Sequence, residues 1–262
     1  MDKILETVLY KAEKNVAYVT FNRPDVHNAF NDVMIRELAE TFDDIGNRPE
    51  IRAVVLSGEG KSFCAGADLN WMRRVKDYSY EENLRESSEL SDMLFCIYSS
   101  PKPTIARVNG AAIGGGTGLV AVCDIAIAAS SAKFSFSEVK IGLIPACISP
   151  YVIKKCGEGR CREFFLTGER MTAERALGAG LVNKVVAMEE LDKTVDQFTS
   201  QLISSGPEAI TRCKELLRNV PLITYDEVKR YTAEVIAQIR GSEEGQEGMD
   251  AFLQKRKPKW NK

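Results

Sequence analysis

The sequence of 262 residues predicts an α/β fold followed by a helical C-terminal region. Up to about residue 186, short runs of β-branched and apolar residues alternate with segments of helical periodicity, a pattern typical of α/β proteins. Beyond that point only helical patterns occur, and no linker, repeat or low-complexity segment separates the two parts. We therefore predict an α/β core over residues 1–195 and a helical region over residues 196–262.

The elements of the core follow from local composition. Runs that are β-branched and aromatic, or short and wholly apolar, predict strands at residues 16–21, 51–56, 104–108 and 125–128. Apolar periodicity predicts one helix after Asn31, another over residues 80–98 that ends before two prolines, and a short helix over residues 119–122. The C-terminal helices are expected near residues 189–204, 207–218, 225–240 and 243–254.

Composition narrows the class of protein. Hydrophobic residues make up 44% and charged residues 27% of the chain, the balance of a soluble globular protein. The net charge of −2 provides no basic field for nucleic acid. No apolar run reaches the length of a bilayer, and the N-terminus resembles neither a signal nor a transit peptide. We predict a cytoplasmic protein with no nucleic-acid or membrane partner.

Cysteine and histidine usage argues against a metal site. The seven cysteines form no C-x-x-C pair, and most of them lie among apolar residues, which favours reduced, buried thiols over disulfides or zinc ligands. The single histidine, His27, lies in a polar turn and is interpreted as structural. No metal is predicted.

The glycine run Gly114-Gly115-Gly116 follows a predicted strand and precedes a helix. Its spacing does not fit a dinucleotide fingerprint, and no lysine follows as a P-loop requires. Two interpretations remain: a tight turn without function, or an anion cradle in which backbone N–H groups and the positive end of a helix dipole face a ligand. The second arrangement suits an oxyanion better than a neutral carbonyl.

A second candidate is the loop over residues 63–68, Phe-Cys-Ala-Gly-Ala-Asp, which also follows an apolar strand. Its small residues admit a flat ligand or supply a second N–H donor. Alone, the loop is equally compatible with an ordinary turn.

Together, residues 63–69 and 109–116 resemble the enoyl-CoA hydratase/isomerase family, also called the crotonase superfamily. Five further stretches match the family in the same order, so that the resemblance covers nearly the whole chain: residues 22–30, 123–128, 138–145, 167–182 and 248–260. The resemblance implies a core built as a spiral of ββα units and a helical C-terminal region that drives assembly into homotrimers or homohexamers. It also implies an acyl-CoA thioester as the substrate and no separate cofactor.

The resemblance assigns roles to individual residues. The backbone N–H groups of Ala65 and Gly115 would form an oxyanion hole for the thioester. The CoA moiety would contact the loop of Ala65, Gly66, Ala67, Asp68 and Leu69. Lys255 lies in a basic C-terminal patch that would either meet the CoA phosphates, in the same or a neighbouring subunit, or form a solvated tail.

Acid–base chemistry departs from the family pattern. Family hydratases carry two glutamates that share one water molecule; the second matches Glu138, but the position of the first is Gly118. Adding water needs a base for the water and an acid for the α-carbon. One glutamate can serve both in a nearly concerted step, or it can shuttle a proton between two carbons, as in Δ3,Δ2-enoyl-CoA isomerases. Both reactions stay open.

Residues 67–72 and 141–152 are similar to bacterial hydratases of branched enoyl-CoAs of the methylglutaconyl-CoA type, so we place the hydratase first. Trp71, Met72 and Pro145 are predicted to line the acyl pocket, with core packing as the alternative for Trp71 and Met72. Two other functions are alternatives. One is a non-catalytic acyl-CoA-binding member of the family. The other is a nicotinamide-dependent dehydrogenase, which the glycine spacing disfavours.

Overall fold

Two sheets form the core of the structure, a computed structural model that describes residues 3–261. The larger sheet has the strand order β1-β2-β3-β4-β6-β8-β11 within that range. β1 to β3 pair antiparallel, and every pair from β3 to β11 is parallel. In sequence order its strands are β1 (Lys3–Ile4), β2 (Val8–Glu13), β3 (Val16–Phe21), β4 (Ala53–Gly58), β6 (Thr104–Val108), β8 (Ile125–Ala129) and β11 (Lys184–Val186).

The smaller sheet runs in the order β10-β9-β7-β5, with one short strand from each of three repeating units and β10 at its edge. Its strands are β5 (Ser62–Cys64), β7 (Ala111–Ile113), β9 (Lys133–Ser135) and β10 (Arg170–Thr172). β4, β6 and β8 in the large sheet are followed by β5, β7 and β9 in the small one, and a helix comes after each pair. The α/β class and the expected succession of ββα units are therefore confirmed.

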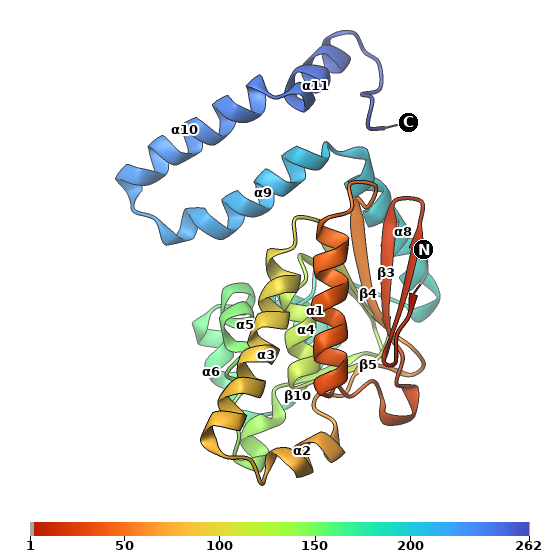
Figure 1. The fold of residues 1–262 in the computed structure, drawn as a ribbon, viewed down its shortest axis with the longest axis vertical. Helices are drawn as coiled ribbons and strands as arrows, with labels where there is room; N and C mark the ends of the chain where they lie inside the picture. Colours follow the sequence, from red (N-terminus) through yellow and green to blue (C-terminus); the bar gives the residue numbers. More distant parts are fainter. Residues whose placement is uncertain (1–2, 262) are drawn as a thin grey trace.

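Helices cover the sheets as their caps and apolar faces predict. α1 (Asp32–Gly46) begins where the Asn31 side chain accepts a hydrogen bond from Met34 N–H, and it buries Leu38 and Phe42. α3 (Tyr80–Ser99) has a capping box formed by Ser79 and Glu82, and it packs along α1. Figure 1 shows both helices on one side of the strands, with α2 (Leu69–Val75) near the end of the molecule farthest from the C-terminus.

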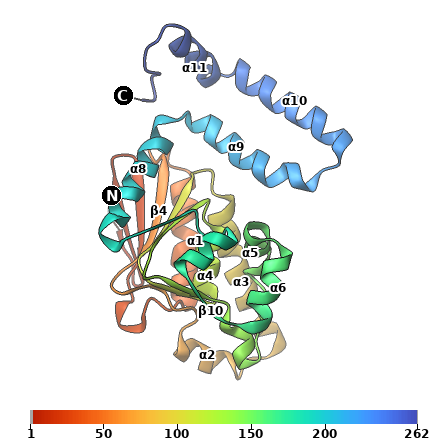
Figure 2. The ribbon, with the colours of Figure 1, turned by 180° about the vertical axis from the view of Figure 1, so that it is seen from behind.

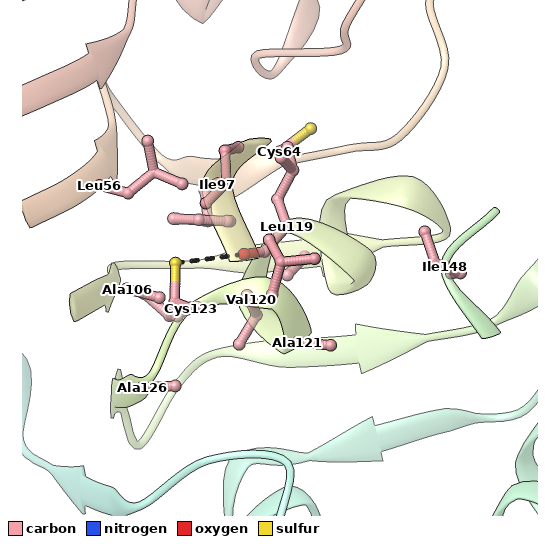
Figure 3. Close-up of a cluster of buried hydrophobic side chains, with 14 of the residues drawn as sticks. Leu56, Cys64, Ile97, Ala106, Leu119, Val120, Ala121, Cys123, Ala126 and Ile148 are labelled. Carbon is pink, nitrogen blue, oxygen red and sulfur yellow. Dashed lines mark hydrogen bonds between the residues drawn. The ribbon is translucent and has the colours of Figure 1, made fainter. Parts of the chain in front are cut away.

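The short helix α4 (Gly115–Val122) lies inside the core, and its last seven residues are buried. Figure 3 shows its apolar side chains surrounded by residues of the neighbouring elements. α4 starts within the glycine run, four residues earlier than the sequence predicted. Glycine has a low intrinsic helix propensity, so the sequence did not predict that the helix begins in the glycine run. In the folded protein, the close packing around this turn leaves room only for glycine.

The predicted boundary at residue 195 falls inside α8 (Met188–Ser204) and moves to the end of that helix. Leu191 and Val195 of α8 pack with Val55, Ile105 and other side chains on the second face of the large sheet. α8 therefore belongs to the core. The remaining elements of the core are α5 (Ser149–Cys156), α6 (Glu158–Thr167) and α7 (Ala173–Ala179), with the 3-10 turns η1 (Pro24–Val26) and η2 (Ser137–Ile141).

The C-terminal arm consists of α9 (Pro207–Asn219), η3 (Val220–Leu222), α10 (Tyr225–Gly241) and α11 (Glu243–Leu253). Within these helices only Ala251 is buried. Figures 1 and 2 show the arm projecting from one end of the core. Glu244 accepts hydrogen bonds from the first backbone N–H groups of α9, and Lys214 pairs with Asp124 of the core at 2.6 Å. None of the described helices is long and apolar enough to cross a lipid bilayer.

Candidate active site

A cavity of about 680 Å³ opens between α2, the N-terminus of α4, η2 and the segment before α5. Every predicted site residue except Asp68 and Lys255 lines it, so the structure brings together Ala65, Gly66, Ala67, Leu69, Trp71, Met72, Gly115, Glu138 and Pro145. Sequence reasoning missed Phe30, Leu90 and Ile148, which also line it. Phe30 and Ile148 lie in stretches that resemble the family, and Leu90 lies on a predicted helix, but an apolar residue in such a stretch is expected only to pack in the core.

The N-terminus of α4 forms the backbone wall of the cavity. Gly114 has φ of +54°, and its N–H donates to the Ser135 carbonyl at 2.8 Å, which bends the chain into the helix. Gly115 is the first residue of α4, so its N–H has no carbonyl of a preceding turn to bond. A Cβ on Gly115 would lie 2.5 Å from the Phe30 ring. A glycine here lets the aromatic ring pack directly against the backbone.

The loop over residues 65–67 corrects one predicted donor. The Ala65 N–H donates to the His27 carbonyl at 3.0 Å and is already satisfied within the protein. Phe30 bridges the loop by donating to the Gly66 carbonyl and accepting from Asp68 N–H. Over residues 3–261, no hydrogen bond is found for the N–H of Ala67, which lies between these two bonds. Ala67 therefore replaces Ala65 as the loop's available donor.

The loop and the helix end lie close together. A Cβ added to Gly66, whose φ is +93°, would sit 4.0 Å from the Gly115 nitrogen and 2.8 Å from the Ile113 carbonyl oxygen. Two backbone donors thus reach the same cavity from different elements. His27, interpreted as structural from the sequence, supports this loop through its carbonyl, and its Nδ1 lies 3.1 Å from Ser62 Oγ.

Asp68 has a structural role and does not line the cavity, and its predicted contact with CoA stays a prediction. Its Oδ1 accepts hydrogen bonds from the N–H groups of Asn70 (2.7 Å) and Trp71 (3.1 Å), which caps α2. Its Oδ2 pairs with Arg23 at 2.8 Å. Burial alone would raise the pKa of Asp68, but the hydrogen bonds from Trp71, Arg23 and Asn70 lower it overall. Both oxygens are occupied, so the carboxylate holds α2 in place.

Glu138, on η2, faces the N-terminus of α4 across the cavity. A Cβ on Gly114 would lie 3.1 Å from Glu138 Oε1. Within the described chain, Glu138 Oε2 is buried without a hydrogen-bond partner. Burial raises the pKa of this carboxyl group, and a backbone hydrogen bond offsets only part of the effect. A buried carboxyl group whose pKa is raised holds a proton more readily than an exposed one, so it can accept and return a proton during a reaction.

The space beside Gly118 is filled by Ile148. A Cβ on Gly118 would lie 2.1 Å from Ile148 Cγ2 and 2.7 Å from Ile148 Cβ. Of the residues that line the cavity, Cys147 is the only titratable one besides Glu138. Burial raises the pKa of the Cys147 thiol, whose Sγ is 3.7 Å from the Ser87 carbonyl oxygen. Glu138 is therefore the cavity's one group suited to acid–base work.

The rest of the cavity is mostly apolar, with Ser87 and Ser137 as its polar side chains. Trp71 is 9% exposed, packs 5.8 Å from the Phe30 ring, and donates through Nε1 to Glu86 at 2.9 Å. Leu69 and Ile144 at the rim are 70% and 72% exposed. Such an exposed hydrocarbon rim around a cavity is a feature of ligand entrances.

Lys255 does not reach this cavity within its own chain. It follows α11 in the arm, and Figure 1 shows the C-terminus at the opposite end of the molecule from α2. In the same basic tail, Arg256 pairs with Glu247 at 2.6 Å. The hydrogen bonds and charge of Arg256 and Lys259 outweigh desolvation and lower the pKa of Glu247 to about 2.

Comparisons with known proteins agree with this geometry. A family model described as enoyl-CoA hydratase/isomerase matches residues 11–262. The short-chain-enoyl-CoA hydratase of Clostridium acetobutylicum is 33% identical over 97% of each chain, and the 1,2-epoxyphenylacetyl-CoA isomerase of Escherichia coli is 34% identical over 98% of this chain and 99% of the relative. The crystal structure of an enoyl-CoA hydratase from Shewanella pealeana superimposes with a TM-score of 0.95 at 40% identity, covering 98% of this chain and 96% of that one. The chain belongs to the enoyl-CoA hydratase/isomerase family.

Proposed function

We propose that the protein is an enoyl-CoA hydratase that adds water across the 2,3 double bond of a short or branched enoyl-CoA. The observation that carries the proposal is the placement of Glu138 opposite the available N–H groups of Ala67 and Gly115 in one apolar cavity. The relatives from C. acetobutylicum and S. pealeana, both named hydratases, support this reaction.

In this mechanism the thioester oxygen accepts hydrogen bonds from Ala67 and Gly115. Glu138 takes a proton from water while the water oxygen bonds to C3. The π electrons of the double bond move toward the thioester oxygen and form an enolate, which the two donors and the N-terminus of α4 stabilise. Glu138 then returns a proton to C2, so that one water molecule is added and the glutamate is regenerated. The CoA thioester is the substrate, and we expect no separate cofactor.

A Δ3,Δ2-enoyl-CoA isomerase is the second candidate, and the packing of Ile148 on Gly118 favours it. With a single acid–base group, Glu138 would remove a proton from C2 of a 3-enoyl thioester and return it to C4. The same two N–H donors would stabilise the intermediate dienolate. No water molecule enters this reaction.

A panel of thioesters separates the candidates. The hydratase proposal predicts that crotonyl-CoA or methylglutaconyl-CoA loses its enoyl absorbance and yields a 3-hydroxyacyl product by mass spectrometry. Conversion of 3-enoyl-CoA to 2-enoyl-CoA without hydration would instead support the isomerase. Binding of these thioesters without any turnover would contradict both and leave a non-catalytic acyl-CoA-binding protein.

We further propose that the arm mediates assembly into a homotrimer or homohexamer. Its helices carry exposed apolar side chains, including Leu217, Leu222, Tyr225 and Phe252, which are 73–87% exposed in the single chain. In such an assembly Lys255 of one copy would meet the CoA phosphates bound by another. Analytical ultracentrifugation should give three or six times the mass of the chain, and a monomer at micromolar concentration would contradict this assembly. Cytoplasmic localisation likewise stays a prediction.

A further inference from the structure

Glu138 and Ile148 both pack on the N-terminal end of α4. Gly114 caps the helix and Gly118 follows one turn later, since Gly118 N–H donates to the Gly114 carbonyl at 3.2 Å. Successive turns of an α-helix are about 5.4 Å apart along its axis. The Glu138 carboxyl sits over Gly114, and the Ile148 side chain sits over Gly118. Both residues line the cavity, so the two side chains meet it at the same end of α4.

The contact between Ile148 and Gly118 excludes any side chain at position 118. The Cβ of even an alanine would come within 2.1 Å of Ile148 Cγ2, far inside van der Waals contact. Ile148 cannot easily move aside, because it is 3% exposed and its carbonyl accepts from the N–H groups of Tyr151 and Val152 at the start of α5. Figure 3 shows Ile148 on the segment that passes beside α4. Gly118 and Ile148 thus form a complementary pair.

The surroundings of Glu138 contain no charged group that would substitute for a second carboxylate. No lysine, arginine, histidine or other acidic side chain lines the cavity, and the Cys147 thiol is its only other titratable group. The shift of the Glu138 pKa arises from burial and from a backbone hydrogen bond, with no contribution from a neighbouring charge. The hydrocarbon around this carboxyl group is therefore what sets its protonation.

We propose that Ile148 determines the reaction specificity of the site, because it occupies the volume beside Gly118 and keeps both a second acid–base group and additional water away from Glu138. The inference rests on the proposed enoyl-CoA chemistry. With the hydrocarbon wall in place, any water that is added must be held by Glu138 alone, and proton transfer without water competes with hydration. Removing the wall should shift this balance toward hydration.

The packing part of the proposal is tested without any substrate, by thermal unfolding of four proteins. Gly118→Ala in the wild-type background should lower Tm by about 5 °C, the cost of an overpacked core. In the Ile148→Gly background, Gly118→Ala should lower Tm far less. Glycine is required at position 148 because alanine retains the Cβ, which is 2.7 Å from the new atom. If Gly118→Ala lowers Tm equally in both backgrounds, Gly118 and Ile148 do not form a complementary pair.

The catalytic part is tested by the pH dependence of kcat/KM and by the ratio of crotonyl-CoA hydration to 3-enoyl-CoA isomerisation. Ile148→Gly should admit water beside Glu138, which lowers the pKa of this carboxyl group, moves the acid limb of the profile to lower pH and raises the ratio by about tenfold. Ile148→Val keeps the Cβ and Cγ2 that lie nearest to position 118 and loses only Cδ1, so it should change both quantities less than Ile148→Ala does. Ile148→Ala, which stays closer to the native backbone, should change both quantities in the direction of Ile148→Gly.

The outcomes separate the two proposals. If wild type turns over enoyl-CoA but Ile148→Gly and Ile148→Ala leave the pH profile and the ratio unchanged, the role of Ile148 is wrong and the proposed function stands. Suppose instead that wild type turns over no enoyl-CoA, while Gly118→Ala lowers Tm less in the Ile148→Gly background than in wild type. The packing of Gly118 against Ile148 is then confirmed, but the proposed function and the specificity built on it are wrong.

Discussion

The two walls of the cavity are built from different chemical groups. The backbone wall contains Ala67 and Gly115, which line the cavity and whose N–H groups find no backbone acceptor within residues 3–261. The side-chain wall presents Glu138 and Ile148, which are held by packing over Gly114 and Gly118. Backbone donors keep their chemistry whatever the side chain, whereas the opposite wall changes its chemistry with every substitution. The backbone wall can therefore serve every reaction of a family, whereas the side chains of the opposite wall select which reaction takes place.

Removing the acid–base group should have the largest effect. Glu138→Gln keeps the shape of the side chain but cannot accept the proton, so kcat should fall by about 100- to 10,000-fold. Binding of a CoA ester should persist, because the backbone wall is intact. Steady-state kinetics measures the fall in kcat, and calorimetric titration measures the binding of the CoA ester. A wild-type rate in this variant would remove Glu138 from the mechanism.

Removing one donor from the backbone wall should come next. Gly115→Pro eliminates the N–H, and proline is tolerated at the first position of a helix. Both this variant and Gly115→Ala bring a Cβ against the Phe30 ring, so alanine is the matched control for the steric cost. We expect proline to reduce kcat about 100- to 1000-fold below the alanine variant. Equal rates in the two folded variants would show that the Gly115 N–H is not used.

Weakening the support of the backbone wall should have the smallest effect, on stability. Asp68→Ala loses both the cap of α2 and the pair with Arg23, at a cost of about 1 to 3 kcal/mol. Asp68→Asn keeps an oxygen for the cap and should lose less. Thermal unfolding at neutral pH should rank the stability as wild type, then Asp68→Asn, then Asp68→Ala. If Asp68→Asn is no more stable than Asp68→Ala, the capping role is contradicted.

The pH dependence of that stability follows from the lowered pKa of Asp68. A carboxyl group whose pKa is lower in the folded state contributes its full stability above its unfolded pKa of about 3.9, and the contribution is lost as pH falls through the folded value. The difference in Tm between wild type and Asp68→Asn should therefore be constant from pH 7 to about pH 5 and shrink below pH 4. A difference that grows on acidification would contradict the assignment.

The sequence predicted the backbone wall better than the side-chain wall. The glycine run was identified from its place between a strand and a helix, the family resemblance singled out Gly115 within it, and α4 begins at that residue. Its partner was misplaced by two residues, because the occupied donor, Ala65, is revealed only by its bond to His27, which comes from a distant turn. The structural role of Asp68 was missed for the same reason, since its ion pair with Arg23 joins residues far apart in sequence.

Ile148 was beyond sequence reasoning. Gly118 showed that a carboxylate is missing, but nothing in the sequence indicates which side chain fills the volume that a glycine leaves. The contact joins α4 to the segment before α5, and β8, β9 and η2 lie between these two parts of the chain. The elements themselves were largely predictable, because caps such as Asn31 and Ser79 and the apolar periodicity of α1 and α3 are local signals.

The most direct test of the proposed site is a crystal structure of the Glu138→Gln variant with crotonyl-CoA. We predict that the thioester oxygen lies about 3 Å from the nitrogen atoms of Gly115 and Ala67, with C2 and C3 facing the side chain at position 138. Ala65 N–H should still donate to the His27 carbonyl. A thioester oxygen bound to Ala65, or one without a contact to Gly115, would contradict the account.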